Sequence, residues 1–425
     1  MSQIKSWDWT TGRRMVSDIG QWREKFGWVE EPYASPDGES VAAIVKVDEM
    51  AFSVCENGSA WENSFDRIWL LRYTPDNRAA ALVSDTAMWT VAVSGTPWEN
   101  WFEFVWDTKF GSDGGFITAA AQSEMNYLAV TNDQPWPDRF HHLNHLKVSP
   151  EGRSAAAVVQ TKAVDEGDIA AFQKGCFTVA VDGRTWERNF LNAWELAFNA
   201  SGTRVAAEVR LNFNDYTIAV DGKPWNQTFS SVWEPVFSPS DGSVTAPVCS
   251  ATGWTLACDG EIIWESRFAQ LWHHFYSTDG GRIAAIAAPR FGRWTLAVDG
   301  KPWKLTFKDL VTDPALSPDG RRSACVGKAD GKWTIAVDGT AWDGAYDMAW
   351  TPVFSPDGSH VAAKLEKNGS YRIVMDGRPV TEEFKALWDP IFSPDGEKLL
   401  IRGIGRGENE DRYMRIVSTV SDLLA

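Results

Sequence analysis

Short runs of apolar and alternating residues, separated by tight turns, make up most of the chain. Trp294–Val298 and Trp333–Val337 mix aromatic and β-branched residues in alternation with others, while Val361–Ala363 is continuously apolar. Aromatic and β-branched residues favour strands, and no sustained helical period is present. We expect a short helix only in the stretch before Trp22. The pattern therefore predicts an all-β protein built from short strands.

The turn sequence Ser-Pro-Asp-Gly recurs between these runs. Ten intact or degenerate copies are present, at Ser35–Gly38, Thr74–Asn77, Gly111–Gly114, Ser149–Gly152, Asn199–Gly202, Ser238–Gly242, Ser277–Gly280, Ser317–Gly320, Ser355–Gly358 and Ser393–Gly396. A second turn is marked by Asp-Gly pairs at Asp182, Asp221, Asp259, Asp299, Asp338 and Asp376. Asp-Gly between apolar runs is a strong hairpin signal, because glycine supplies the positive φ of a tight turn. Each repeat is thus predicted to contain two hairpins.

A Trp-x-x-x-Phe/Tyr motif recurs in phase with the turns. Its copies begin at Trp22, Trp61, Trp98, Trp136, Trp186, Trp225, Trp264, Trp303 and Trp342, with Val380 in the last. Successive copies are 37 to 39 residues apart, except for one spacing of 50 that reflects an insertion around Lys162–Gly175. Ten copies of two markers in phase predict ten repeats of one supersecondary unit.

Four antiparallel strands repeated with a period near 40 residues are typical of β-propeller blades. We therefore expect a single propeller of about ten four-stranded blades over residues 22–425, after an N-terminal extension over residues 1–21. The last repeat has no Trp-x-x-x-Phe strand, and Trp22–Phe26 is a copy without a repeat before it. The N-terminal strand is thus predicted to close the last blade, which removes two exposed edges. Two five-bladed rings are the alternative, but no linker appears near the midpoint.

Most repeats carry a second tryptophan eight residues after the first, at Trp69, Trp106, Trp194, Trp233, Trp272, Trp350 and Trp388. Large flat side chains fill wedge-shaped gaps between sheets, so we expect these indoles to pack between blades. The alternative is a set of stacking platforms for sugars or another planar ligand. Both kinds of turn should lie on one rim, and the other rim should carry variable, binding loops, at Thr161–Gly175, Leu211–Asp215 and Gly403–Asp411.

The net charge of −16, from 41 basic and 57 acidic residues, argues against nucleic acid as a partner. The sequence contains no apolar run of 18 residues, so no membrane span is predicted. Met1–Met15 has no signal-peptide pattern, and we therefore expect a cytoplasmic protein. The cysteines form no CxxC or haem motif and are expected as free, mostly buried thiols: Cys55, Cys176, Cys249, Cys258 and Cys325. Cys249 and Cys258 are the one pair that adjacent strands could bring together.

Few residues suggest catalysis or the binding of a metal or cofactor. His141, His142 and His145 cluster in one repeat and His273 and His274 in another, as rim histidines or as a metal- or haem-ligating pair. The Asp-rich turns lack the convergent oxygens of a calcium loop, and turn geometry alone explains them. No nucleophile, zinc or phosphate-binding motif is present. We therefore assign no catalytic, cofactor-binding or metal-ligating residue, expect no cofactor, and predict that the protein is not an enzyme.

The Ser-Pro-Asp-Gly repeat resembles TolB-type and WD-like propeller repeats over the whole chain. Together with Trp-x-x-x-Phe and the segments Ala219–Trp225 and Ala297–Trp303, it is similar to the tryptophan-rich propeller subunit of the transmembrane redox complex of sulfate-reducing bacteria. This resemblance implies a non-catalytic accessory subunit, peripheral on the inner face of the cytoplasmic membrane. Its implied partners are cytochrome b and iron–sulfur subunits, with a multihaem cytochrome c on the other side. A carbohydrate-binding or carbohydrate-active propeller, or a generic protein-interaction propeller, is the alternative.

Overall fold

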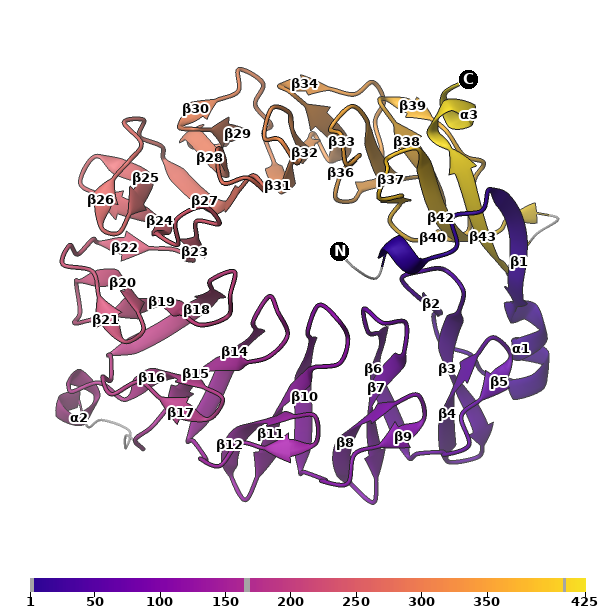
Figure 1. Cartoon of the computed structure of the whole chain (residues 1–425), viewed down its shortest axis with the longest axis horizontal. Coiled ribbons are helices and arrows are strands. Elements are labelled where there is room, and N and C mark those ends of the chain that lie inside the picture. Colours follow the sequence, from indigo (N-terminus) through magenta and orange to yellow (C-terminus); the bar gives the residue numbers. More distant parts are fainter. Residues whose placement is uncertain (1–3, 164–168, 408–409) are drawn as a thin grey trace. The chain divides into compact units, whose positions relative to one another are not determined.

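The protein, seen in a computed structural model that describes residues 4–163, 169–407 and 410–425, is an all-β, ten-bladed propeller (Figure 1). Each blade is an antiparallel sheet, and in nine of the ten the strands follow one another in chain order; in the tenth, β1 is added beside β43. In three blades the first strand is split into two short pieces. The predicted fold class and blade number are confirmed.

Strand β1 (Gly12–Asp18) comes first along the chain. The five sheets that follow it contain β2 (Tyr33–Ala34), β3 (Val41–Asp48), β4 (Ala51–Glu56), β5 (Ser59–Ala60), β6 (Arg67–Tyr73), β7 (Ala79–Asp85), β8 (Met88–Val93), β9 (Thr96–Pro97), β10 (Phe104–Phe110), β11 (Ile117–Ser123), β12 (Asn126–Thr131), β13 (Gln134–Pro135), β14 (His142–Val148), β15 (Ala155–Gln160), β16 (Phe177–Val181), β17 (Arg184–Thr185), β18 (Asn192–Phe198), β19 (Val205–Arg210), β20 (Tyr216–Val220) and β21 (Lys223–Pro224). The remaining strands are β22 (Ser231–Val232), β23 (Val236–Phe237), β24 (Val244–Ser250), β25 (Gly253–Cys258), β26 (Glu261–Ile262), β27 (Gln270–Tyr276), β28 (Ile283–Arg290), β29 (Arg293–Val298), β30 (Lys301–Pro302), β31 (Leu310–Leu316), β32 (Ser323–Ala329), β33 (Lys332–Val337), β34 (Thr340–Ala341), β35 (Met348–Ala349), β36 (Val353–Phe354), β37 (Val361–Lys367), β38 (Ser370–Met375), β39 (Arg378–Pro379), β40 (Ala386–Leu387), β41 (Ile391–Phe392), β42 (Lys398–Ile404) and β43 (Arg412–Thr419). The helices are η1 (Ile4–Ser6), α1 (Ile19–Phe26), α2 (Ile169–Gln173) and α3 (Val420–Leu424).

The chain divides into two compact units. Unit 1 comprises Met1–Ala81, Val93–Thr96 and Tyr276–Ala425, and unit 2 comprises Leu82–Ala92 and Pro97–Phe275. Unit 1 contains the whole sheets β2–β5, β31–β34 and β35–β39, together with the sheet that joins β1 to β40–β43. Unit 2 contains the whole sheets β10–β13, β14–β17, β18–β21 and β22–β26.

The Ser-Pro-Asp-Gly turn is held by its own side chains. In the turn before β37, the Ser355 carbonyl accepts from Gly358 N at 2.8 Å, and Gly358 has a φ of 74°. Ser355 Oγ donates to Asp357 Oδ1 at 2.6 Å and accepts from His360 N at 3.0 Å. Hydrogen bonds from Ser355 and then Ser359 lower the pKa of Asp357 to about 2. Hydrogen bonds within the turn therefore occupy this carboxylate.

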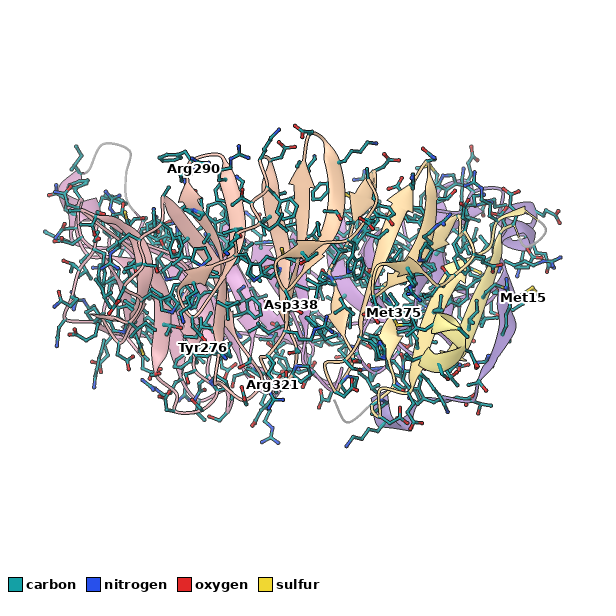
Figure 2. The ribbon with its side chains drawn as sticks, turned by 90° about the horizontal axis from the view of Figure 1, so that it is seen from above. Met15, Tyr276, Arg290, Arg321, Asp338 and Met375 are labelled. Carbon is teal, nitrogen blue, oxygen red and sulfur yellow. The ribbon has the colours of Figure 1, made fainter. Side chains whose placement is uncertain are left out.

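The Asp-Gly turn between the third and fourth strands is closed in a similar way. Asp338 and Gly339 have φ values of 51° and 78°, and Asp338 Oδ1 accepts from Ser323 N at 2.8 Å. Because Ser323 begins β32 directly after the Ser317–Gly320 turn, both turns lie at the same end of the sheet, as predicted. The turn between the second and third strands lies at the other end. Figure 2 shows Arg321, beside the first kind of turn, and Arg290, beside the turn between β28 and β29, at opposite edges of unit 1.

In several blades, the first tryptophan and the aromatic residue of the Trp-x-x-x-Phe motif pack between successive sheets. Trp136 and Phe140 contact Ala120 and Ala129 of one sheet and Leu143 of the next, and all are buried. Small alanines on the second and third strands leave room for these rings. Such interlocking aromatic and alanine positions form the core of the blades.

The motif itself departs from the predicted fourth strand. In unit 2, the fourth strand β21 is only Lys223–Pro224, just before Trp225. Trp225 N then donates to Ile218 O at 2.8 Å, and Phe229 forms an isolated bridge with Tyr216. The motif thus follows the sheet edge through separate contacts rather than as a regular strand, because its rings turn toward the neighbouring sheet.

The prediction that an N-terminal strand closes the last blade is confirmed, but its assignment to Trp22–Phe26 is wrong. The N-terminal strand that completes this blade is β1, which pairs antiparallel with β43 in the register Gly12 to Val417, and it lies within the predicted extension. Trp22–Phe26 lies in α1, whose N-cap Asp18 accepts from Gly20 N and whose C-cap Gly27 is left-handed. This pair of caps starts and stops a helix regardless of the repeat motif inside it.

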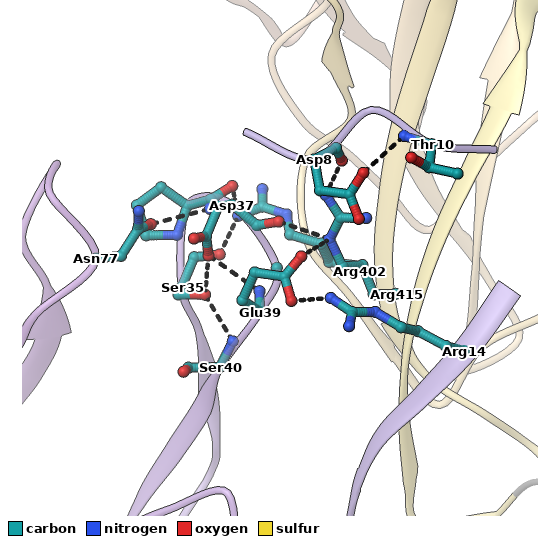
Figure 3. A network of polar contacts seen from close by, with 12 residues as sticks. Asp8, Thr10, Arg14, Ser35, Asp37, Glu39, Ser40, Asn77, Arg402 and Arg415 are labelled. Carbon is teal, nitrogen blue, oxygen red and sulfur yellow. Dashed lines mark hydrogen bonds and ion pairs between the residues drawn. The ribbon is translucent and has the colours of Figure 1, made fainter. Parts of the chain in front are cut away.

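A polar network in unit 1 joins the completed last blade to the first turn of the repeat (Figure 3). The buried Arg402 guanidinium donates to the carbonyls of Ser35 at 2.9 Å, Pro36 at 3.2 Å and Asp389 at 2.9 Å. Arg415 Nε donates to the carbonyl of Asp37 at 2.9 Å. Further members of the network are Asp8, Arg14, Glu39 and Asn77. Two arginines thus hold the Ser35–Gly38 turn against the sheet that contains both ends of the chain.

Candidate functional site

The first strand of most blades is interrupted at one recurring position, just after the second tryptophan. The pairing register shifts between Asn144 and Lys147 in β14, and between Trp194 and Leu196 in β18. His145 and His273 occupy this position with φ values of 51° and 49°. A bulge bends the strand and re-aims a side chain away from the regular ladder. The position nine residues after the first tryptophan is therefore a place where the fold presents variable side chains.

In unit 2 these positions form acid–histidine pairs between successive blades. His145 Nδ1 lies 3.1 Å from Glu195 Oε1, and Lys147 Nζ lies 3.4 Å from Glu195 Oε2. One repeat later, Glu234 Oε1 accepts from His273 N and lies 3.3 Å from His273 Nδ1. The same repeat position thus carries His145, Glu195, Glu234 and His273 on four successive blades.

These contacts divide the nearby carboxyl groups by pKa. The hydrogen bond from His145 comes first among the effects that lower the pKa of Glu195 to about 2. Burial alone raises the pKa of Glu234, but hydrogen bonds from His273 outweigh it and leave that pKa below its ordinary value. Burial raises the pKa of Glu208, on β19, to about 8, and the charges of Glu234 and Glu195 add to this rise. Glu208 thus keeps its proton at neutral pH while its two neighbours are ionised.

A cavity of about 670 Å³ opens beside these pairs, within unit 2. It is lined by Lys147, Glu195, Leu196, Trp233, Glu234, Pro235, Trp272 and His273. The Trp233 indole is stacked on Trp254, with ring centroids 5.4 Å apart and planes within 10°. Trp233 is 41% exposed, so one side of the stacked pair remains accessible. The site therefore offers a supported aromatic face with two carboxylates at its edge.

The second tryptophans pack on the third strand of their own sheet, and two of them also pack against the neighbouring sheet, as predicted: Trp106 against the cluster that includes Leu143, and Trp388 against the cluster that includes Val41. Trp194 stacks on Tyr216 and Trp388 contacts Tyr413 edge-on, in each case on the third strand of its own sheet or on the strand that takes its place. Trp69 is half-exposed, at 51%. First tryptophans such as Trp136 and Trp225 pack between blades as well. The register shift follows the second tryptophan, so Trp106 and Trp194 still pair with Ala120 and Glu208 on the next strand.

A smaller cavity in unit 1 has a different charge. It has a volume of about 460 Å³ and its lining includes the half-exposed Trp28 and Trp69. Lys46 and Arg67 lie beside these indoles, together with Glu30, whose pKa is raised by burial and by Glu31. It is an indole-lined cavity with cationic side chains at its rim, and so a natural comparison for the site in unit 2.

The remaining histidines of the two predicted clusters have separate surroundings. His142 contacts the Tyr127 ring edge-on at 5.4 Å, and His141 is exposed. His274 is buried, with Nε2 2.9 Å from Thr245 Oγ1, and burial lowers its pKa to about 4. No group of three or more His, Cys, Asp or Glu side chains suited to a metal ion occurs in the described ranges. The two clusters therefore do not converge on one ligand set.

The five cysteines are free thiols, as expected. Cys55, Cys176 and Cys325 are buried, and burial raises the pKa of the Cys325 thiol. Cys249 and Cys258 lie on the adjacent strands β24 and β25, but Cys249 pairs with Trp254 and Cys258 with Thr245. The register therefore separates the one pair that the sequence left open.

Of the three loops predicted to bind, Leu211–Asp215 is described throughout, whereas residues 164–168 of Thr161–Gly175 and 408–409 of Gly403–Asp411 lie outside the described residues. Arg210 holds the Leu211–Asp215 loop by donating to the Phe213 carbonyl at 2.7 Å.

None of the helices in the described part of the chain has the length and apolar character needed to cross a bilayer.

Of the cavity residues, the sequence singled out Trp233, Trp272 and His273, but not the acids Glu195 and Glu234, although a signal for them existed. Glu195 and Glu234 stand at the same repeat position as His145 and His273, and the sequence comparison singled out only the histidines. Alignment of this one column across repeats would have placed acids and histidines on neighbouring blades.

Comparison with known proteins identifies no family. No family model matches the chain, and no curated protein matches it. Among solved structures, the chain is similar to one described as the crystal structure of the eukaryotic initiation factor. The identity is 11% and the TM-score 0.46, over 84% of this chain and 88% of that one. A likeness at this level adds nothing to what the ten sheets establish about the fold.

Proposed function

We propose that the protein is a non-catalytic binding scaffold that holds partner proteins through the loops at one end of its blades. The observation that carries this proposal is an asymmetry between the two ends. The Ser-Pro-Asp-Gly and Asp-Gly turns are tight and use their polar groups internally. The opposite turns expose large apolar side chains, among them Met125 and Phe291, each 81% exposed.

The apolar side chains stand at equivalent places in several blades. Met50 follows β3, Met125 follows β11, Phe213 follows β19 and Phe291 follows β28, each at or near the turn that leads to the third strand. Single exposed apolar residues are common on proteins, but recurrence at the same turn of four repeats is typical of a binding face. A partner surface that covers the tips of either unit would gain the free energy of burying them.

The resemblance of the repeats supports a more specific setting. We propose an accessory subunit of a membrane-associated electron-transfer complex, cytoplasmic and peripheral on the inner face of the membrane. Its partners would be cytochrome b and iron–sulfur subunits, and the chain itself would carry no redox centre. Free thiols without metal-ligating spacing fit such a role.

Purification of the complex from native membranes tests this proposal. We expect a cytochrome b subunit and an iron–sulfur subunit to co-elute in fixed ratio with the wild-type chain. Phe291→Ser should reduce this recovery, whereas Arg321→Ser, at the opposite end of the blades, should leave it unchanged. A chain that elutes alone from membranes in which the redox subunits are intact would contradict the proposal.

Carbohydrate binding is the second candidate, and one observation favours it. Trp233 is half-exposed and has hydrogen-bonding side chains beside it, including Lys147 and Glu234. An open indole beside polar groups is the arrangement that sugar rings require. Quenching of tryptophan fluorescence by a neutral oligosaccharide, abolished by Trp233→Leu, would support this candidate, and a flat titration would exclude it.

A further inference from the structure

The cavity in unit 2 combines two features that together define a ligand chemistry. The first is the Trp233 face, supported from behind by Trp254 at 5.4 Å. The second is a pair of carboxylates: Glu234 lies on the same blade as Trp233, and Glu195 lies on the blade before it. An indole face attracts a cation through its ring quadrupole, and a carboxylate accepts hydrogen bonds from it. A flat cation that satisfies both at once is a guanidinium group.

The balance of charge around the cavity leaves a negative excess. Lys147 Nζ is engaged with Glu195 Oε2 at 3.4 Å, so one cation and one anion cancel. Glu234 contributes a second anion, and its partner His273 carries charge only when protonated. Glu208, on β19 and 7% exposed, keeps its proton and adds no charge of its own. The field of Glu234 and Glu195 at Glu208 points to a site that favours added positive charge.

The size of the cavity fits part of a protein chain. A volume of about 670 Å³ lies within the range of sites that enclose drug-sized groups, and it exceeds what one side chain needs. The chain carries a net charge of −16, which favours a basic partner surface through long-range attraction. The companion cavity in unit 1, with Lys46 and Arg67 at its rim, lacks this complementarity.

We propose that the cavity binds an arginine side chain presented by a partner protein, with the guanidinium over the Trp233 indole and its N–H groups directed to Glu234. This inference rests on the proposed scaffold function and names the kind of partner surface that the scaffold holds. The arginine stacks on the side of Trp233 opposite Trp254, and Glu195 adds to the negative field. No covalent or redox step is involved.

Calorimetric titration of the full-length chain with three peptides tests the proposal. The peptides are identical glycine- and serine-based decamers that carry one central arginine, lysine or citrulline. We expect the arginine peptide to bind, the lysine peptide to bind several-fold more weakly because it cannot stack flat, and the citrulline peptide not to bind measurably. Equal affinity for arginine and its neutral isostere citrulline would overturn the proposal.

Two variants separate the site from general acidity of the surface. Trp233→Leu removes the stacking face and Glu234→Gln removes one charge with little change of shape. Each should weaken the arginine peptide by about 5- to 30-fold, in the range expected for one cation–π or one charge-assisted contact. Trp69→Leu is the matched control, because Trp69 is a half-exposed second tryptophan beside basic residues, and it should leave the affinity unchanged. Equal weakening by all three variants would overturn the proposal.

A proton-linked readout distinguishes binding at this cavity from binding elsewhere. A cation beside Glu234 should draw the proton from Glu208, so that binding at pH 7 releases protons and the apparent enthalpy depends on the buffer. The other titratable groups that face the site are Glu195 on β18, His145 and Lys147 on β14, and His273 and His274 on β27. Glu208→Gln should abolish most of the release. Arginine binding without proton release would contradict this placement.

Failure of this inference can be told apart from failure of the scaffold proposal. If Trp233→Leu and Glu234→Gln leave co-purification of the redox subunits intact and the arginine peptide does not bind, the arginine site is wrong and the scaffold proposal stands. If cellotriose, but not the arginine peptide, quenches Trp233 fluorescence, the cavity belongs to the carbohydrate candidate. Loss of the redox subunits from the wild-type purification refutes the scaffold proposal itself.

Discussion

Replacement of Glu208 by glutamine should stabilise the protein, and increasingly so as the pH rises. Glu208 is buried on β19, and its pKa is raised from 4.5 to about 8 by burial first and then by Glu234 and Glu195. In the unfolded chain the same carboxyl group ionises near its ordinary value. The native state therefore binds one more proton than the unfolded state between about pH 4.5 and 8.

The sign and size of the effect follow from this difference in proton binding. Each pH unit within the window reduces the free energy of unfolding by about 1.4 kcal/mol, because the unfolded state releases the proton and the native state retains it. Above about pH 8 the accumulated cost levels off at about 5 kcal/mol at most. Below about pH 4.5 the carboxyl group is protonated in both states, and the cost disappears. Glutamine resembles the protonated acid, so Glu208→Gln removes the pH-dependent part.

The assay compares thermal and urea unfolding of the wild type and Glu208→Gln from pH 4 to pH 9. We expect the two proteins to unfold alike at pH 4 and the variant to gain stability steadily up to about pH 8. Glu124→Gln, an exposed substitution in the turn between β11 and β12, is the control and should follow the wild type throughout. A stability difference between wild type and Glu208→Gln that does not change with pH would refute the reasoning. A carboxyl group that keeps its proton only in the native state must make that difference depend on pH.

Three further predictions concern the framework. Arg402→Met removes the donor to three backbone carbonyls between the last blade and the first turn, and should lower the free energy of unfolding by about 2–4 kcal/mol in urea titrations. Gly327→Ala would place a Cβ atom 2.3 Å from the Phe307 ring, and calorimetry should show a loss of about 1–3 kcal/mol. A thiol reagent should modify only the partly exposed Cys249 and Cys258 in the native protein, and all five cysteines after unfolding.

Matched surface changes provide the controls for these framework variants. Arg321→Met removes an arginine whose side chain is 84% exposed and which pairs with Asp319 at the protein surface, and it should be nearly neutral. Gly115→Ala has no heavy atom closer than 3.5 Å to the added carbon. If Arg402→Met is as mild as Arg321→Met, the network does not hold the last blade. Rapid modification of Cys325 in the native protein would contradict its buried position.

The repeated sequence motifs were sufficient to predict the fold. The two in-phase motifs gave the blade number because each marks a fixed place in a four-stranded sheet, and the Asp-Gly pairs gave the hairpins because only certain residues accept a positive φ. The closing strand was assigned to the wrong segment, because Trp22 matches the repeat motif while Asp18 and Gly27 cap a helix around it. Local caps decided the structure where motif matching suggested a strand.

The candidate site was less accessible from the sequence than the fold. Periodicity predicts which residues face a sheet, but it does not reveal the break between β22 and β23 in which Trp233 and Glu234 lie. His145 and His273 were noticed as rare residues, whereas Glu195 and Glu234 were overlooked among 57 acids. The pairing of a histidine with the acid of the next blade depends on the contact between first strands, which exists only once the blades are assembled.

Hydrogen–deuterium exchange of the protein, alone and within its isolated membrane complex, tests most directly whether one end of the blades holds partners. The account predicts that complex formation protects the turns near Met50, Met125, Phe213 and Phe291 and the first strands around Trp233. The Ser-Pro-Asp-Gly and Asp-Gly turns should exchange equally in both samples. Protection confined to those polar turns, with the apolar tips unchanged, would contradict the account.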